Sequence, residues 1–175
     1  MRPQDIAILL KIIALDKEAW NMAFLSNSLQ ISVSEVSESL NRSKIANLID
    51  YSKKEVNRQN LFEFIEYGVK YVFPQPPGSL VRGIATAHSH PSIKDNFVSE
   101  INYVWPDPNG EILGLAIETF YGKQAKACIS DPIFYKIMSL VDMVRIGKTR
   151  EVEFANYELK TIILNEPAPY QYHKN

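Results

Sequence analysis

Leu25-Ser26-Asn27-Ser28-Leu29-Gln30-Ile31-Ser32-Val33-Ser34-Glu35-Val36-Ser37-Glu38-Ser39-Leu40 is the stretch of sequence that decides the fold. Leu25 and Leu29 have the i, i+4 spacing of one helix face, and Val36 and Leu40 repeat that spacing further along the chain. The residues between the two pairs are mostly polar, which is typical of a tight turn. The stretch therefore predicts two short helices joined by a turn, a helix-turn-helix spanning about Met22 to Leu48.

Three features of this stretch fit the turn itself. Ser26 is small, and two helices that cross closely need a small residue at the crossing point. Ile31 is apolar and is expected to close the turn from beneath. Ser32 or Val33 is expected at the start of the second helix, because serine is a preferred N-cap residue.

Apolar residues at helical spacing predict further helices on both sides of this motif. The expected helices are Gln4–Leu15, a segment from about Glu18 through Leu29, Ser34–Asn47, a segment capped by Asn57 and running through Tyr71, Lys123–Ile129, Pro132–Gly147, and Thr149–Leu164. The chain is therefore expected to be mainly α.

The richest cluster of proline and glycine, Phe73-Pro74-Gln75-Pro76-Pro77-Gly78-Ser79, marks the best boundary in the chain. Beyond it, Tyr103–Trp105 and Ile112–Ile117 are apolar runs that fit a strand pair or an extended arm. The predicted organisation is a helix-turn-helix DNA-binding domain at 1–72, an irregular or short-β central segment at 73–120, and a C-terminal helical module at 121–175.

Composition indicates a globular protein in a reducing compartment. Of 175 residues, 46% are hydrophobic and 22% are charged, which is the balance of a chain that buries a core. Cys128 is the single cysteine, so no intramolecular disulfide can form. Lys11 interrupts the first apolar stretch, so neither a membrane span nor secretion is expected, and we expect a cytoplasmic protein. The net charge of -1 is unusual for a nucleic-acid binder.

The same motif resembles the helix-turn-helix of MarR-like winged-helix regulators, which are bacterial transcription factors. The resemblance covers residues 1 to about 70, and it departs from the family pattern at Gln30, where a glycine is customary. The interval between Leu48 and Asn57 is also too short for the long basic hairpin wing of that family. What the resemblance implies is a sequence-specific transcriptional regulator whose second helix enters the major groove of double-stranded DNA.

Candidate DNA contacts follow from side-chain chemistry. Asn pairs well with adenine and Arg with guanine, and Glu accepts a hydrogen bond from cytosine, whereas basic side chains hold phosphates. The candidates for base reading are Ser34, Glu35, Ser37, Glu38, Asn41 and Arg42, and the candidates for a positive patch that holds phosphates are Arg42, Lys44, Lys53, Lys54 and Arg58.

A rival motif favours a different class of protein. His88-Ser89-His90-Pro91, followed by Ser99 and Asn102, resembles the JAMM-type metalloprotease motif, in which two histidines and an aspartate hold zinc. Asn102 replaces the third ligand, and an amide is a poor zinc ligand. The only upstream candidates for a general base are Glu63 and Glu66. We therefore expect two histidines in a polar loop with ordinary hydrogen bonds, no metal, no cofactor and no enzyme activity.

Two expectations concern protein partners. An antitoxin-like module that binds the product of a neighbouring gene is a third hypothesis. Specificity on DNA favours a homodimer, because one short recognition helix contacts little DNA. The apolar residues expected to form the dimer surface lie on the first helix and on the C-terminal helices: Ile6, Leu10, Ile13, Phe134, Met138, Val141, Val152, Phe154, Leu159 and Ile163.

Overall fold

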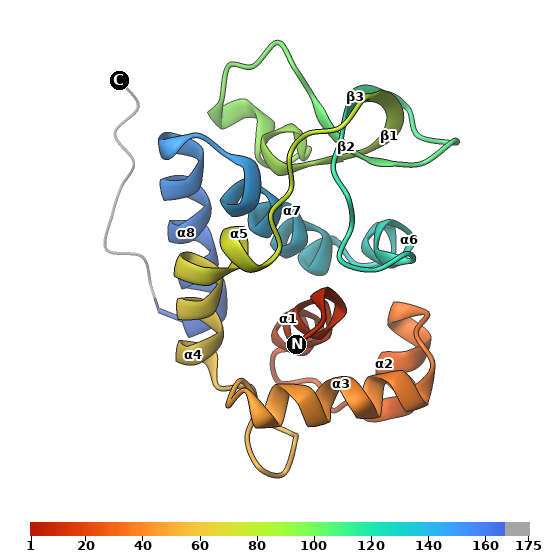
Figure 1. Ribbon diagram of the computed structural model, residues 1–175, viewed down its shortest axis with the longest axis vertical. Coiled ribbons are helices and arrows are strands. Elements are labelled where there is room, and N and C mark those ends of the chain that lie inside the picture. The colour runs from red at the N-terminus through yellow and green to blue at the C-terminus, as the bar shows by residue number, and fades with distance from the viewer. Residues whose placement is uncertain (167–175) are drawn as a thin grey trace.

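The computed structural model describes residues 1–166 as a mostly helical protein with a small sheet at one end (Figure 1). The helices are α1 (Pro3–Leu15), α2 (Met22–Leu29), α3 (Val33–Ile45), α4 (Arg58–Glu63), α5 (Val69–Val72), α6 (Gln124–Ile129), α7 (Pro132–Ile146) and α8 (Thr149–Leu164), with a π-helical turn at Phe64–Gly68 and short 3-10 turns at Ala87–Ser89 and Lys94–Asn96. The strands are β1 (Leu80–Thr86), β2 (Tyr103–Pro106) and β3 (Ile112–Ala116). Residues 167–175 of the predicted C-terminal module lie outside the described part.

The mainly α prediction is confirmed, and apart from the start of α2 the helix bounds lie within two residues of the expected ones. The helix expected from Glu18 begins only at Met22, because the Asn21 side chain accepts a hydrogen bond from the Phe24 N–H (2.8 Å) and caps the helix there. Asn57 does precede α4, but its side chain donates to the Asn47 carbonyl (2.8 Å) and does not cap the helix.

The first helix, α1, is the centre of the molecule. It lies between α2 and α3 on one side and α7 on the other (Figure 1). Almost every side chain from Asp5 to Leu15 is buried, so the helix has no solvent-facing side. Two layers therefore pack on α1, one on each side.

Two charged side chains are buried along α1, and each pairs with a different layer. The Arg42 guanidinium donates to both carboxylate oxygens of Asp5, at 2.7 Å from Nη2 to Oδ1, and so ties α1 to α3. Lys11 pairs with the carboxylate of Asp131, which also accepts a hydrogen bond from the Phe134 N–H (3.0 Å) and caps α7. The same helix thereby sets the positions of both neighbours.

The sheet differs from the predicted strand pair. β2 and β3 are strands, but they pair with each other in parallel, with Val104 opposite Ala116. Both pair antiparallel with β1, a strand that the sequence did not single out. The crossing is tight at Gly83, where an added Cβ would lie 2.1 Å from the Trp105 carbonyl oxygen. Glycine is therefore required at this position.

A buried ion pair fastens the sheet to α7. The carboxylate of Asp142 accepts hydrogen bonds from the Thr86 hydroxyl (2.8 Å), the Trp105 indole N–H (2.7 Å) and the Arg145 guanidinium (2.8 Å). Arg145 also donates to the Phe73 carbonyl (3.0 Å) and so holds the proline-rich connection. Burial raises the pKa of Asp142, although the positive charge of Arg145 and the hydrogen bonds oppose the rise.

One hydrophobic core runs through all three predicted segments. Side chains of α1, α3, α7 and α8 belong to a single cluster of buried residues. The apolar side chains that the sequence assigned to a dimer surface are part of this core, and apart from Val152 and Phe154 they are buried within the chain. That assignment is wrong, because α1, α7 and α8 cover one another.

Within residues 1–166, no helix is both long enough and apolar enough to cross a bilayer.

We expect Asp142→Ala to lower the free energy of unfolding by about 3–5 kcal/mol, because the substitution leaves Arg145 buried without its partner. The measurement is urea denaturation followed by circular dichroism. Glu153→Ala, at an exposed position of α8, is the control and should change stability by less than about 0.5 kcal/mol. Equal midpoints for the two variants would contradict the role given to this ion pair.

Candidate nucleic-acid interface

The turn between α2 and α3 has the geometry that the sequence predicted. Gln30 adopts the left-handed backbone conformation (φ 56°, ψ 42°), which glycine adopts more easily than other residues. The Ile31 N–H donates to the Ser26 carbonyl (3.1 Å), and the Ser26 hydroxyl donates to the Ile31 carbonyl (2.6 Å). The two hydrogen bonds between Ser26 and Ile31 thus close the turn. The left-handed backbone of Gln30 is strained, whereas glycine would adopt this conformation without strain.

Ser32 caps α3, since its hydroxyl accepts a hydrogen bond from the Glu35 N–H (3.2 Å). Val36 and Leu40 are buried beneath the helix as expected. Five predicted contact residues lie on the other side, where α3 is at least partly exposed: Ser34, Ser37, Glu38, Asn41 and Lys44. α3 therefore presents a polar face with little charge of either sign.

A short hairpin follows α3. The sequence had predicted no helix or strand for this interval. It comprises residues Leu48–Asn57, and its strands meet at one antiparallel bridge between Ile49 and Val56. The Asp50 N–H donates to the Glu55 carbonyl (2.8 Å) and the Asn57 N–H to the Leu48 carbonyl (2.9 Å). The hairpin therefore lies directly after α3 and is closed by backbone hydrogen bonds.

The carboxylate of Asp50 organises the tip of this hairpin. It accepts hydrogen bonds from the backbone N–H groups of Ser52 (3.0 Å), Lys54 (2.7 Å) and Glu55 (2.8 Å), and one from the Ser52 hydroxyl. These bonds favour the ionised carboxylate and hold the pKa of Asp50 well below its usual range. The turn is therefore fixed at neutral pH.

Two lysines connect the hairpin with α3. The Lys53 ammonium donates to the Asn41 side-chain oxygen (3.0 Å), and the Lys44 ammonium lies 4.6 Å from the ring centroid of Tyr51. Lys53 has a left-handed backbone (φ 60°) at the tip. The polar face of α3 and the hairpin thus form one continuous surface that carries these two positive charges.

Two candidate base readers, Arg42 and Glu35, form ion pairs with other side chains of the protein. Arg42 pairs with Asp5 and with the Glu35 carboxylate (2.8 Å), which also accepts from Arg2 (3.2 Å). Burial by itself would raise the pKa of Asp5, but hydrogen bonds from Arg42 and from the Arg2 backbone outweigh it and keep this pKa below its ordinary value. The main task of Arg42 is therefore to neutralise a buried carboxylate.

Lys54 and Arg58 lie apart from the polar face of α3. The Lys54 ammonium is 4.9 Å from the ring of Trp20, and Arg58 donates to the Ile163 carbonyl (2.8 Å) and contacts Asp16 (3.5 Å). With Trp20 and Asp16 they line a cavity of about 320 Å³. The single positive patch expected from the sequence is thus divided, with Lys44 and Lys53 on one side and these two residues on the other.

His88 and His90 are buried and make hydrogen bonds within the protein, but the Nε2 of His90 has no hydrogen-bond partner among the described residues. The Nε2 of His88 is 2.9 Å from the Ile101 carbonyl oxygen, and its Nδ1 is 3.0 Å from the Glu151 carboxylate. The Nδ1 of His90 accepts from the Ser92 N–H (3.1 Å), and the side-chain amide N–H of Asn102 donates to the Leu113 carbonyl (3.3 Å). In the described part of the chain, no three His, Cys, Asp or Glu side chains come together as a metal site would require.

Comparisons of this chain with protein-family models, curated proteins and solved structures returned no match. The case for a function therefore depends on the side chains of α3 and the hairpin. Sequence reasoning did not single out Arg2, which contacts Glu35 near the start of α3, nor Asp50, which organises the hairpin, nor Tyr51, which lies against Lys44. No residue pattern marks Arg2, because its contact with Glu35 joins residues 33 positions apart.

We expect Arg42→Ala to destabilise the fold by about 3–5 kcal/mol, because the carboxylate of Asp5, whose side chain is 0% exposed in the wild-type protein, would lose its cationic partner. Urea denaturation measures the change. In the double variant Asp5→Ala/Arg42→Ala the loss should be smaller than the sum of the two single losses. A fully stable Arg42→Ala protein that has lost only DNA affinity would instead make Arg42 a base reader.

The pH dependence of stability should report His90. Burial, followed by the positive charge of Lys136, lowers the pKa of His90 to about 4 from 6.5. Between pH 6.5 and about pH 4, His90 therefore holds a proton in the unfolded chain that it does not hold in the folded protein. The free energy of unfolding should consequently fall by about 2 kcal/mol from pH 7 to pH 5. His90→Leu should be less stable at pH 7 but show a smaller loss on acidification, as measured by urea denaturation at each pH. An unchanged pH slope in that variant would contradict this assignment.

Proposed function

We propose that this protein is a sequence-specific transcriptional regulator that binds double-stranded DNA with α3 in the major groove and the hairpin on the adjacent backbone. The observation that carries the proposal is the exposed polar face of α3, which continues into the hairpin through the contact between Lys53 and Asn41. The resemblance of the motif to MarR-like regulators supports the same function.

The chemistry of this face suits base reading. Asn41 can offer its amide to adenine, and Glu38 can accept a hydrogen bond from cytosine. Ser34 and Ser37 add short side chains that hydrogen-bond with any base edge. Because Asn41 already accepts a hydrogen bond from Lys53, its amide is held in place before DNA arrives.

Phosphate contacts fall to three cations around this face. Lys44 and Lys53 flank it at the hairpin, and Arg2 lies near the start of α3 with 62% of its side chain exposed. Each phosphate contact contributes about -0.9 to the slope of log K against log salt, so three contacts give a slope of about -3. Base contacts must therefore supply much of the affinity, which fits the net charge of -1.

The homodimer remains part of this proposal, because a palindromic site doubles the contacts of one short recognition helix. The residues first assigned to its surface are core residues, so a dimer must use other side chains.

We expect Lys44→Ala/Lys53→Ala to weaken binding to the duplex upstream of the protein's own gene and to reduce the salt slope by about 2. Asn41→Ala should weaken binding to that duplex by about 1–3 kcal/mol and scarcely change binding to random duplexes. Fluorescence anisotropy with labelled duplexes, over a series of salt concentrations, measures both effects.

Lys94→Ala is the matched control, because Lys94 is an exposed lysine in the 3-10 turn beyond β1. It should leave affinity and salt slope unchanged. If the wild-type protein binds no duplex at low salt, where the phosphate contribution is largest, the proposal is wrong. It is equally wrong if Lys94→Ala and Lys44→Ala/Lys53→Ala reduce affinity alike.

A further inference from the structure

His88 connects two segments that are far apart in the sequence. Its Nδ1 lies 3.0 Å from a carboxylate oxygen of Glu151 at the start of α8, and its Nε2 lies 2.9 Å from the Ile101 carbonyl oxygen. Ile101 belongs to residues 97–102, which form a strap between the second 3-10 turn and β2. Figure 1 shows this green part of the chain near the start of α8. His88 therefore joins the strap to α8.

Both oxygens that face His88 act as hydrogen-bond acceptors. A carbonyl oxygen has no hydrogen to donate, and the other oxygen of the Glu151 carboxylate accepts a hydrogen bond from the Lys148 N–H (2.7 Å), as an ionised group does. A neutral imidazole has a proton on one nitrogen only, so it would turn a lone pair toward one of the two oxygens. The observed contacts therefore fit the imidazolium, which donates from both nitrogens.

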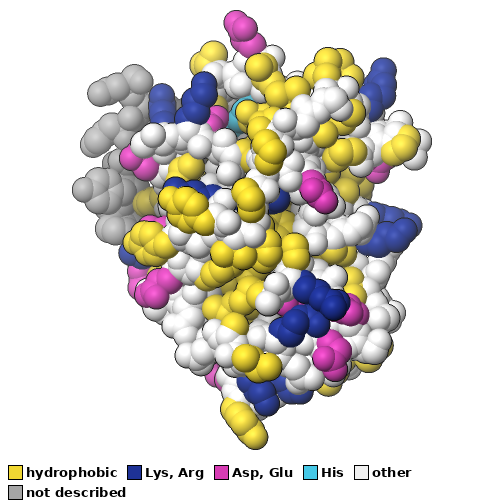
Figure 2. Space-filling view, viewed as in Figure 1, with side chains coloured by type: hydrophobic (Ala, Val, Ile, Leu, Met, Phe, Trp, Pro, Cys, Tyr) yellow, Lys and Arg dark blue, Asp and Glu magenta, His cyan; other side chains and the backbone are white. Residues whose placement is uncertain are grey.

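The contact is shielded from solvent. His88 has 6% of its surface exposed, and the Tyr103 ring packs against it with 4.9 Å between the ring centroids. In Figure 2, histidine occupies only a small area of the face shown. A buried group that loses its partner does not recover the hydrogen bond from water, which makes the loss costly. A change in the protonation of His88 would therefore act directly on the strap.

The two ends of the strap have other anchors. The Phe97 ring packs edge-on against the Phe154 ring of α8 (5.3 Å between centroids), and the Asn102 carbonyl accepts a hydrogen bond from β3 (2.8 Å). Residues 98–101 between these ends are exposed at the surface. The hydrogen bond donated by His88 thus ties the middle of the strap to the interior of the protein.

Histidine is the residue type whose charge ordinarily changes between pH 5 and 8. Two ionisable neighbours of His88 stay neutral in that range. Burial, followed by the charge of Glu151, raises the pKa of Tyr103, whereas burial, followed by the charge of Lys136, lowers the pKa of His90 to about 4.

The elements packed around His88 also contribute fixed charges. Lys136 of α7 pairs with Glu158 (2.6 Å), and Asp142 of α7 pairs with Arg145 (2.8 Å). The other charged residues of the strap, the start of α8 and the second 3-10 turn are Glu100, Arg150, Lys94 and Asp95. The charge in direct contact with the His88 ring is the carboxylate of Glu151.

We propose that His88 is a pH-sensitive clasp, which holds the strap in place while it is protonated and releases it when the pH rises. The single remaining proton would stay on Nδ1, because a hydrogen bond to the Glu151 carboxylate is stronger than one to a carbonyl. The lone pair of Nε2 would then face the Ile101 carbonyl oxygen and repel it. Because both ends stay anchored, the released state is a mobile loop of residues 98–101 on an otherwise unchanged fold.

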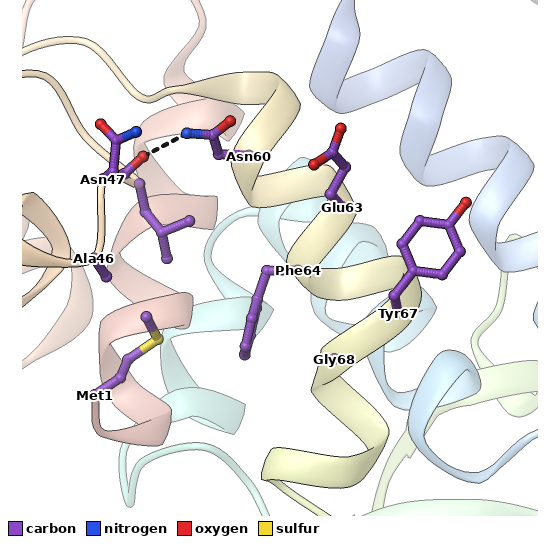
Figure 3. Close-up of a pocket in the computed structure, with 9 residues that line it drawn as sticks. Met1, Ala46, Asn47, Asn60, Glu63, Phe64, Tyr67 and Gly68 are labelled. Carbon is purple, nitrogen blue, oxygen red and sulfur yellow. Dashed lines mark hydrogen bonds between the residues drawn. The ribbon is translucent and has the colours of Figure 1, made fainter.

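The surface proposed for DNA depends on other contacts. The Asn60 amide donates to the Asn47 carbonyl (2.8 Å) and fixes the end of α3, as Figure 3 shows, and Lys53 donates to Asn41 at the hairpin. Neither contact involves His88. The clasp therefore does not rest on the proposed function, and either proposal can fail without the other.

Backbone amide relaxation of the full-length protein, measured by NMR over a series from about pH 6 to about pH 9, tests the clasp. The order parameters of Val98, Ser99 and Glu100 should fall from about 0.85 at the acidic end to below about 0.6 at the alkaline end. The midpoint of this fall should coincide with the titration of the His88 ring, followed in the same samples.

Glu151→Gln is the decisive variant. The new amide can donate to Nδ1 of a neutral His88 while its oxygen still accepts from the Lys148 N–H, so the imidazole keeps its proton on Nε2 for the Ile101 carbonyl. The strap should therefore stay ordered over the whole pH series. Glu153→Gln, at an exposed position of the same helix, is the matched control and should lose strap order with rising pH as the wild-type protein does.

His88→Asn provides the opposite case, because it keeps a donor near the Nδ1 position and has none at Nε2. Its strap should be mobile at every pH. Circular dichroism verifies folding, and if His88→Asn does not fold, the wild-type protein and Glu151→Gln decide. The proposal is overturned if the wild-type strap keeps its order parameters across the series, or if Glu151→Gln loses strap order with rising pH as the wild-type protein does.

Discussion

Two opposite charges buried along α1 impose the arrangement of the other helices. A carboxylate and an ammonium removed from water each need a partner of opposite sign, because an unpaired buried charge costs several kcal/mol. Asp5 finds its partner on α3 and Lys11 finds its partner at the start of α7. A shift of either neighbour would break one of these pairs. α3 and the C-terminal half of the chain are therefore positioned by the same central element.

This arrangement limits the charge that would remain for the DNA binding that we propose. Arg42 lies on α3 among the candidate base readers, yet its guanidinium pairs with the carboxylates of Asp5 and Glu35. In the proposed complex, phosphate contacts would fall to other cations, such as Lys53 of the hairpin. Specific hydrogen bonds would then contribute more to affinity than they do in a strongly basic DNA-binding protein.

The sequence predicted what depends on neighbours along the chain. Turn chemistry at Ser26 and Ile31 and the cap at Ser32 are local, and they formed where the residue types indicated. The role of Arg42 and the pairing of β1 with two strands depend on contacts between residues far apart, for which a single sequence carries little signal.

The central place of α1 has a consequence for synthesis of the protein. α1 leaves the ribosome well before Asp131, the partner of Lys11, which lies 120 residues further along the chain. At about 5–20 residues per second, α1 waits roughly 6 to 24 s before α7 can cover it. During that interval an almost wholly apolar helix is exposed in the nascent chain. Efficient production should therefore depend on chaperones that shield this helix until translation is complete.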